Sequence, residues 1–277
     1  MTDANFAYVA DYPSGQSLHK VSVGTNLTGT GICSDASGHV FMTGYNEGTS
    51  VKGYVFEFAH GGASPIATLA MSGSPTGCSI DPTTGNLAVT STSNGNCDGS
   101  KVEIYPSATG TPTTYDVAGF ACLTGAAYDG QGNLFVGGSV GGSNPPPYAI
   151  AELPSGSSDF TSISLNERIT CTGFECGTPI QWVGDYLAIT KPTADHASPM
   201  VYHVRISGSV GTVVGTTTFH GHFNRFSGTG SWVQGDKIVL NYGLNNVALW
   251  SYPGGGKALN TLKGFKGFAH PGLTISE

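Results

Sequence analysis

Two kinds of turn recur along this chain about every 47 residues, and they limit the folds that it can adopt. The first kind reaches a glycine and leads into an apolar run; its glycines stand at positions 38, 85, 132, 184 and 235, and the first three copies start at an aspartate. The second kind resembles Tyr-Pro-Ser-Gly, with its second residue at positions 13, 59, 106, 154, 206 and 253. Asp can cap a turn and Gly supplies positive φ, so we expect Asp35, Asp81 and Asp129 to be turn caps.

Short apolar runs such as Val40–Thr43 and Val102–Tyr105 fill the space between the turns. Because the two turn series interleave, each repeat has room for four strands in a meander, which we name A to D. A four-stranded repeat of about 40 to 50 residues is typical of a β-propeller blade. The sequence therefore predicts an all-β fold, a single six-bladed β-propeller domain over residues 1–277. Its blades are expected at about residues 28–74, 75–120, 121–168, 169–219, 220–265 and 266–277 plus 1–27.

The sixth blade is expected to be split between the two chain ends, because the second turn series has six members and the first has five. We expect residues 268–276 to form its innermost strand and residues 6–24 its outer strands. Pairing of the N- and C-terminal strands would then close the ring and remove exposed sheet edges. Extrapolation of the spacing leaves this blade without its second strand.

The composition excludes several classes of protein. Glycine contributes 42 residues and proline 15, which disfavours a helical bundle, a coiled coil or a doubly wound α/β fold because both residues destabilise helix interiors. The net charge is −7 and the chain has only three arginines, so no basic surface for nucleic acid is expected. No apolar run approaches the roughly 18 residues that a membrane span needs.

Few charged residues and six cysteines are typical of a protein that works outside the cytoplasm. The chain shows no signal peptide, since Met1 leads directly into strand-like sequence, and we expect that a leader has been removed. The sequence thus predicts a secreted or periplasmic protein. The low surface charge is compatible with a homodimer.

The combination of Asp-x-x-Gly-Asn-Leu, as at Asp129–Leu134, with a Tyr-Pro-Ser-Gly turn resembles bacterial NHL-type and gluconolactonase-like (regucalcin-like, TolB-like) six-bladed propellers. The resemblance covers essentially the whole chain and rests on structural turns, which indicate fold rather than function. The family includes calcium-dependent lactonases and phosphotriesterases, lyases and many binding propellers. Its hydrolases hold a central calcium ion with Glu, Asn and Asp from inner strands, whereas this chain has few acidic residues there.

The candidate site lies on the face where the D-to-A crossings and B-to-C loops surround the central channel, which we call the upper face. His220, His222 and His270 are the candidate metal ligands, because alternating histidines on an extended segment point to one side. We expect His222 and His270 to approach each other across the channel entrance. Together with Glu175 and Arg225 they are also the catalytic candidates. The alternative interpretation is a hydrogen-bonded polar rim without any metal.

Aromatic and amide side chains at the same crossings indicate a ligand site. Phe174, Phe223 and Asn224 join His220, His222, Arg225 and His270 as candidate ligand-binding residues. Aromatic faces with polar neighbours suit a small organic or carbohydrate ligand. The alternative interpretation places these phenylalanines in the packing between blades.

The six cysteines predict disulfides rather than metal thiolates, because their number is even and no Cys-x-x-Cys pair is present. Cys78 and Cys97 are expected to pair within one blade. Cys122 is expected to pair with Cys171 or Cys176 across neighbouring crossings. The remaining cysteine, at position 33, is expected to be a buried free thiol. Six reduced cysteines in a cytosolic protein are the alternative.

The leading functional hypothesis is an extracytoplasmic bacterial propeller that acts as a ligand-binding or protein-interaction scaffold through its upper face and central channel. Its partner would be a small organic or carbohydrate ligand, or another protein. The alternative is a metal-dependent hydrolase, lactonase-like, or a lyase, with calcium or a transition metal in a histidine-lined central channel.

Overall fold

The computed structural model describes most of the chain, and all further statements concern this part. It comprises residues 6–16, 19–22, 27–46, 51–93, 97, 99–141, 146–171, 179–191, 198–221, 223, 230–242, 246–265 and 272–276. Its regular structure is β-strand apart from one short 3-10 turn, η1 (Pro106–Ala108). No helix in these segments has the length and apolar character to cross a membrane.

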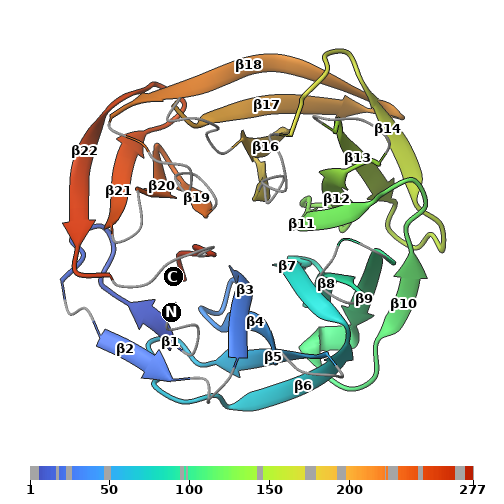
Figure 1. Ribbon diagram of the computed structural model, residues 1–277, viewed down its shortest axis with the longest axis horizontal. Coiled ribbons are helices and arrows are strands. Elements are labelled where there is room, and N and C mark those ends of the chain that lie inside the picture. Colours follow the sequence, from blue (N-terminus) through green and yellow to red (C-terminus); the bar gives the residue numbers. More distant parts are fainter. Residues whose placement is uncertain are drawn as a thin grey trace.

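Five antiparallel four-stranded meanders are arranged radially around a centre, as the blades of a β-propeller (Figure 1). In each blade the first strand is innermost and the fourth is outermost. Blades I and II contain β3 (Leu27–Ser34), β4 (Val40–Asn46), β5 (Lys52–Phe58), β6 (Ala67–Ser72), β7 (Ser74–Ile80), β8 (Leu87–Thr92), β9 (Lys101–Tyr105) and β10 (Thr113–Asp116). Blade III contains β11 (Cys122–Tyr128), β12 (Leu134–Ser139), β13 (Tyr148–Leu153) and β14 (Thr161–Leu165).

Blades IV and V complete this set of meanders. They contain β15 (Ile180–Val183), β16 (Tyr186–Lys191), β17 (Met200–Ser207), β18 (Val210–His220), β19 (Ser231–Gln234), β20 (Lys237–Asn241), β21 (Asn246–Ser251) and β22 (Gly255–Lys263). The outer strands of blades III, IV and V are joined at the perimeter by short parallel pairings, β14 with β18 and β18 with β22. These three blades therefore form one 12-stranded sheet.

The two chain ends lie in the remaining sector of the ring (Figure 1). The hairpin of β1 (Phe6–Val9) and β2 (His19–Ser22) lies outside, and the C-terminal segment 272–276 lies nearer the centre. Ser34 of β3 hydrogen-bonds to the Thr274 hydroxyl at 2.8 Å and donates to the Ile275 carbonyl at 2.9 Å. The segment 272–276 is not a strand, unlike the expectation that residues 268–276 form the innermost strand of a sixth blade; residues 268–271 lie outside the described residues.

The predicted turn caps are confirmed. Asp35 accepts backbone N–H bonds from Ser37 and His39, and Asp129 accepts them from Gln131 and Asn133. Asp81 caps its turn through the N–H of Thr83 and through the hydroxyl groups of Thr83 and Thr84.

In blades II and III a hydrogen bond connects the two kinds of turn. The Oδ1 atom of Asn86, next to the first turn of blade II, accepts the Ser107 N–H at 3.0 Å. In blade III, Asn133 Oδ1 accepts the Ser155 N–H at 2.9 Å. The asparagine of the A–B turn thus fixes the C–D turn of the same blade. Both turns lie on one face of the ring, which we call the lower face.

Glycines bring the innermost strands of successive blades together. A Cβ atom on Gly31 would lie 2.9 Å from Cα of Gly77, and a Cβ atom on Gly77 would lie 3.2 Å from Cα of Gly125. Gly272 continues this series, since its Cβ would lie 3.2 Å from the Gly31 carbonyl carbon. The β-bulges in the A–B pairs of blades I to III fall at the first three glycines.

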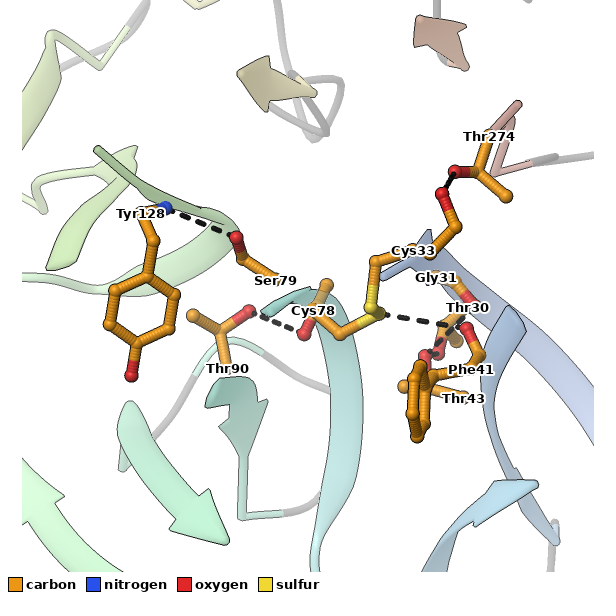
Figure 2. The surroundings of a disulfide bond; sticks show 12 residues. Thr30, Gly31, Cys33, Phe41, Thr43, Cys78, Ser79, Thr90, Tyr128 and Thr274 are labelled. Atoms are coloured by element: carbon orange, nitrogen blue, oxygen red, sulfur yellow. Dashed lines mark hydrogen bonds between the residues drawn. A yellow bond between two sulfur atoms is a disulfide. The ribbon is translucent and has the colours of Figure 1, made fainter. Parts of the chain in front are cut away.

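Two disulfides join neighbouring blades. Cys33 of β3 pairs with Cys78 of β7, with a Cα–Cα distance of 5.7 Å, and Figure 2 shows Thr274 on the other side of this strand. Cys97 pairs with Cys122 of β11, with a Cα–Cα distance of 4.3 Å. Cys171 is also disulfide-bonded. Cys176, the other cysteine expected as a possible partner of Cys122, lies outside the described residues.

The predicted pairs were wrong, both Cys78 with Cys97 and Cys122 with Cys171 or Cys176. The prediction of a free thiol at Cys33 was also wrong. Successive residues of a strand point to opposite faces. Cys33 is two residues after Gly31, whereas Cys78 is one residue after Gly77, the equivalent glycine. The two side chains therefore face each other across the boundary between blades I and II.

Candidate functional site

The structure describes only two of the predicted ligand-binding residues, and it places neither at the channel mouth. His220 is exposed at the end of the outermost strand β18, where its backbone pairs with Lys257 of β22. The eleven residues of β18 carry the chain along the perimeter, which takes His220 away from the centre.

Phe223 is 6% exposed and belongs to the packing between blades IV and V, the alternative that the sequence left open. Its ring packs edge-to-face on Tyr242, with centroids 5.3 Å apart, and stacks at 6.0 Å on Trp250. The other candidates lie outside the described residues, so their roles stay predictions: Phe174, Glu175, His222, Asn224, Arg225 and His270. Among the described residues, no group of three His, Cys, Asp or Glu side chains could hold a metal ion.

An open groove of about 530 Å³ lies on the lower face between blades III and IV. It is formed by the A–B turns of both blades, by strands β12 and β13 and by the C–D turn of blade IV. Its lining residues are Asp129, Gly130, Gln131, Asn133, Phe135, Glu152, Trp182, Gly184, Asp185, Ile206 and Gly208. This is the candidate functional site, on the opposite face from the one expected.

Two stacked aromatic rings form the apolar wall of the groove. The rings of Phe135 and Trp182 lie 5.1 Å apart with an interplanar angle of 16°. Phe135 is 2% exposed and anchors the pair in the core of blade III. The indole N–H of Trp182 donates to the Gly184 carbonyl at 2.9 Å, which fixes the orientation of the ring.

Three carboxyl groups line the groove, and they differ in what they bind. Asp129 is buried and caps its own turn, and Asn133 Nδ2 donates to its second oxygen at 2.8 Å. Asp185 forms an exposed ion pair with Arg205 at 2.9 Å. Glu152 has no hydrogen-bond or ion-pair partner among the described residues. Burial raises the pKa of the Glu152 carboxyl, and the nearby charge of Asp129 raises it further.

At the corresponding boundary between blades IV and V, aromatic side chains fill the space. His203 stacks on Tyr186 with centroids 4.7 Å apart and contacts Tyr252 at 5.4 Å. The Tyr186 hydroxyl donates to the Tyr252 hydroxyl, and His203 Nε2 lies 3.0 Å from Thr217 Oγ1. Thr217 donates to the Pro253 carbonyl, so its oxygen accepts the Nε2–H of a neutral His203.

The free energy of unfolding is expected to fall between pH 7.5 and pH 5, in part because of His203. Burial lowers the pKa of His203 in the folded protein, whereas the unfolded side chain titrates near about 6.5. Below that pH the unfolded state binds more protons, so the stabilisation present at neutral pH is lost as the pH falls. Urea unfolding at both pH values should show a smaller loss for His203→Gln than for wild type. The exposed His60→Gln variant should behave as wild type, and an unchanged loss in His203→Gln would contradict the prediction.

Sequence reasoning missed the groove because it considered only the crossings and loops of the upper face. A signal was present in the sequence. Glu152 is a lone acid in an apolar run, Ala149–Leu153, and Trp182 stands directly before an A–B turn. The two positions belong to neighbouring blades, and their proximity follows only from the radial arrangement.

No known protein family matches this sequence, and no curated protein shows significant sequence similarity to it. Similar folds occur among solved structures. The WD40 repeats of RRP9 match with a TM-score of 0.54 and 10% identity, over 95% of this chain and 67% of that one. A chain of the mitotic checkpoint complex matches with a TM-score of 0.55 and 15% identity, over 99% and 77%.

Hydrazine synthase of Kuenenia stuttgartiensis matches with a TM-score of 0.56 and 12% identity, over 89% of this chain and 70% of that one. Identities this low indicate a shared fold and nothing further. The similarities support a β-propeller, while the expected NHL-type and gluconolactonase-like relationship stays a prediction.

Proposed function

We propose that the protein is a bacterial binding propeller that works outside the cytoplasm and holds its ligand in the groove between blades III and IV. The observation that carries this proposal is Glu152, a half-buried carboxyl group that has no partner within the described part of the chain, beside the stacked rings of Phe135 and Trp182. A concave surface with an apolar wall and a few convergent polar groups is the usual form of a small-ligand site.

The groove favours binding over catalysis. Acid–base hydrolysis by paired carboxylates needs two groups that are free to exchange protons with the substrate. Asp129 is committed to its turn and Asp185 to Arg205, which leaves Glu152 alone. The alternative of a metal-dependent hydrolase or lyase depends on His222 and His270 of the upper face, and it stays a prediction.

A secreted or periplasmic location is part of this proposal. Disulfides persist in oxidising compartments and are rare in the cytosol. The bonds Cys33–Cys78 and Cys97–Cys122 support such a location. Propellers also serve as protein scaffolds, so the ligand group could be presented by a protein partner.

We also propose that the ring has six blades, the sixth being formed by β1, β2 and the C-terminal segment. Two contacts support this count. Gly272 approaches Gly31 as Gly31 approaches Gly77, and Ser34 binds Thr274 and Ile275. Leu273 and Ile275 pack in one cluster with Tyr8 and with Leu262 of blade V, which supports a sixth blade next to blade V.

Tryptophan fluorescence tests the binding site, because Trp182 lines the groove and the ligand class can be left open. Titration with small saccharides, alkyl amines and carboxylic acids should change the emission of the wild-type protein for at least one class. Trp182→Phe should abolish this change, whereas Trp232→Phe, in blade V, should retain it. If no class alters the emission, or if Trp182→Phe responds as wild type, the proposed site is wrong.

A further inference from the structure

Blade I contains a counterpart of the groove's carboxyl group, and there the carboxylate has a partner. In the strand registers, Phe41 pairs with Glu57 in blade I as Phe135 pairs with Glu152 in blade III. Glu57 and Glu152 therefore occupy the same position in their blades. His39 Nδ1 lies 2.9 Å from Glu57 Oε1, so the carboxylate of blade I has a nitrogen partner from its own turn.

Blade III lacks this built-in partner. Asn133 occupies the place of His39, since both backbone carbonyls accept the N–H of the turn aspartate, Asp129 or Asp35. The Asn133 Nδ2 donates to Asp129 and its Oδ1 accepts from Ser155, so its amide does not serve Glu152. Among the residues that the structure describes, no side chain therefore donates to the carboxyl group of Glu152, which is available to a donor from a ligand.

Blade II indicates that the fold does not require a carboxylate at this position. There the register pairs Ala88 with Ile104, so an apolar residue stands in the place of Glu57 and Glu152. A half-buried Glu152 is costly for folding because its charged form is partly desolvated and lies close to Asp129. The carboxylate of blade III is therefore better explained by what it binds than by what it stabilises.

The class of ligand can be inferred from the polar groups of the groove that are still available for hydrogen bonds. A sugar would need several donors and acceptors, but the Trp182 indole N–H is already bonded and each end of the Asn133 amide already makes one hydrogen bond. A metal ion would need several ligands at short range, and the described residues contain no such group of three. What remains is the Glu152 carboxylate acceptor beside the stacked rings, with the exposed amide of Gln131, and no basic residue is among the described residues that line the groove.

We propose that the groove binds an organic cation carried on an apolar stem, an alkyl ammonium or guanidinium group, with the charge at Glu152 and the stem along the ring of Trp182, which Phe135 supports from below the surface. Carboxylates form strong charge-assisted hydrogen bonds with such groups, and aromatic faces attract them. This inference rests on the proposed binding function and names its ligand class. The same chemistry occurs in free amines and in the arginine or lysine side chains of a peptide.

The matched probes are n-butylguanidinium and n-butylurea, which share their shape and differ in charge. Calorimetric titration of the whole protein should give an affinity for the cation about tenfold or more above that for the urea, in the range of a charge-assisted hydrogen bond. Glu152→Gln should remove this preference without lowering the melting temperature. Glu57→Gln, the matched change in blade I, should leave binding as in wild type.

A second variant reverses the comparison between the blades. Asn133→His introduces the blade I arrangement into blade III. The new imidazole is expected to hydrogen-bond to the Glu152 carboxylate, as His39 does to Glu57, and to weaken cation binding about tenfold or more. Two further probes distinguish a free small-molecule cation from a side chain of a peptide. Tighter binding of agmatine indicates the free cation, and tighter binding of an arginine-containing peptide indicates the side chain.

Equal affinity for n-butylguanidinium and n-butylurea, or undiminished cation binding in Glu152→Gln, would overturn the inference. If a neutral ligand changes the emission of the wild-type protein and Trp182→Phe abolishes this change, the proposed binding function stands and only the ligand class fails. If no probe binds in either experiment, both fail.

Discussion

Replacement of both Cys33 and Cys78 by alanine is expected to lower the free energy of unfolding by about 4 kcal/mol. The bond closes a loop with a sequence separation of 45, so its loss releases a large amount of chain entropy in the unfolded state. The Cys97/Cys122 pair, with a separation of 25, should contribute about 3.5 kcal/mol by the same reasoning. Urea unfolding of each double variant measures both values.

A loss below about 1 kcal/mol for either pair would show that blade packing alone holds these strands in place. Alkylation of the unfolded, unreduced protein followed by mass measurement provides the control. The four cysteines of the two bonds should stay unmodified without reductant and should react after reduction.

The second large effect is expected at the inner strands, where Gly31→Val should destabilise the protein by about 3 kcal/mol. A Cβ on Gly31 would lie 2.9 Å from both Gly77 Cα and Thr43 Oγ1, and the backbone of β7 cannot rotate away as a side chain could. Blade I would have to separate from blade II to admit the side chain. The unfolding midpoint in urea measures the loss.

Gly130→Ala provides the matched control, because nothing lies within 4 Å of a Cβ atom at that position. Its free energy of unfolding should change by less than about 0.5 kcal/mol, as is usual for surface substitutions. Similar losses in both variants would mean that the contact between β3 and β7 is not what limits substitution at Gly31.

The all-β class and the propeller architecture could be predicted because turn chemistry is local. Asp35, Asp81 and Asp129 cap turns within two to four residues of themselves, so the pattern needs no knowledge of distant parts of the chain. The Thr-Gly pairs at 30–31, 76–77 and 124–125 form a further repeat that marks the innermost strands. Sequence reasoning did not use it, because a close approach of two backbones becomes evident only in three dimensions.

The pairing of the cysteines and the lining of the groove depend on which neighbouring blade each face of a strand packs against. A shift of one residue relative to the inner glycine decides whether a cysteine faces the preceding or the following blade. The groove depends in turn on side-chain volume. Tyr186, His203 and Tyr252 fill the boundary between blades IV and V, whereas the stacked Phe135 and Trp182 leave an opening between blades III and IV. The sequence repeats do not indicate which boundary between blades is filled and which is open.

Neighbouring blades are joined in two different ways in the two halves of the ring, because among the described strands only blades III to V have the parallel pairings of β14 with β18 and of β18 with β22. Blades I to III are held near the hub by covalent bonds, and blades III to V are held at the rim by backbone hydrogen bonds. A mild reductant acts on the two bonds near the hub and on the disulfide of Cys171, and it leaves the backbone pairings at the rim intact. After reduction, blades I to III are joined by packing between side chains, whereas blades III to V remain one continuous sheet.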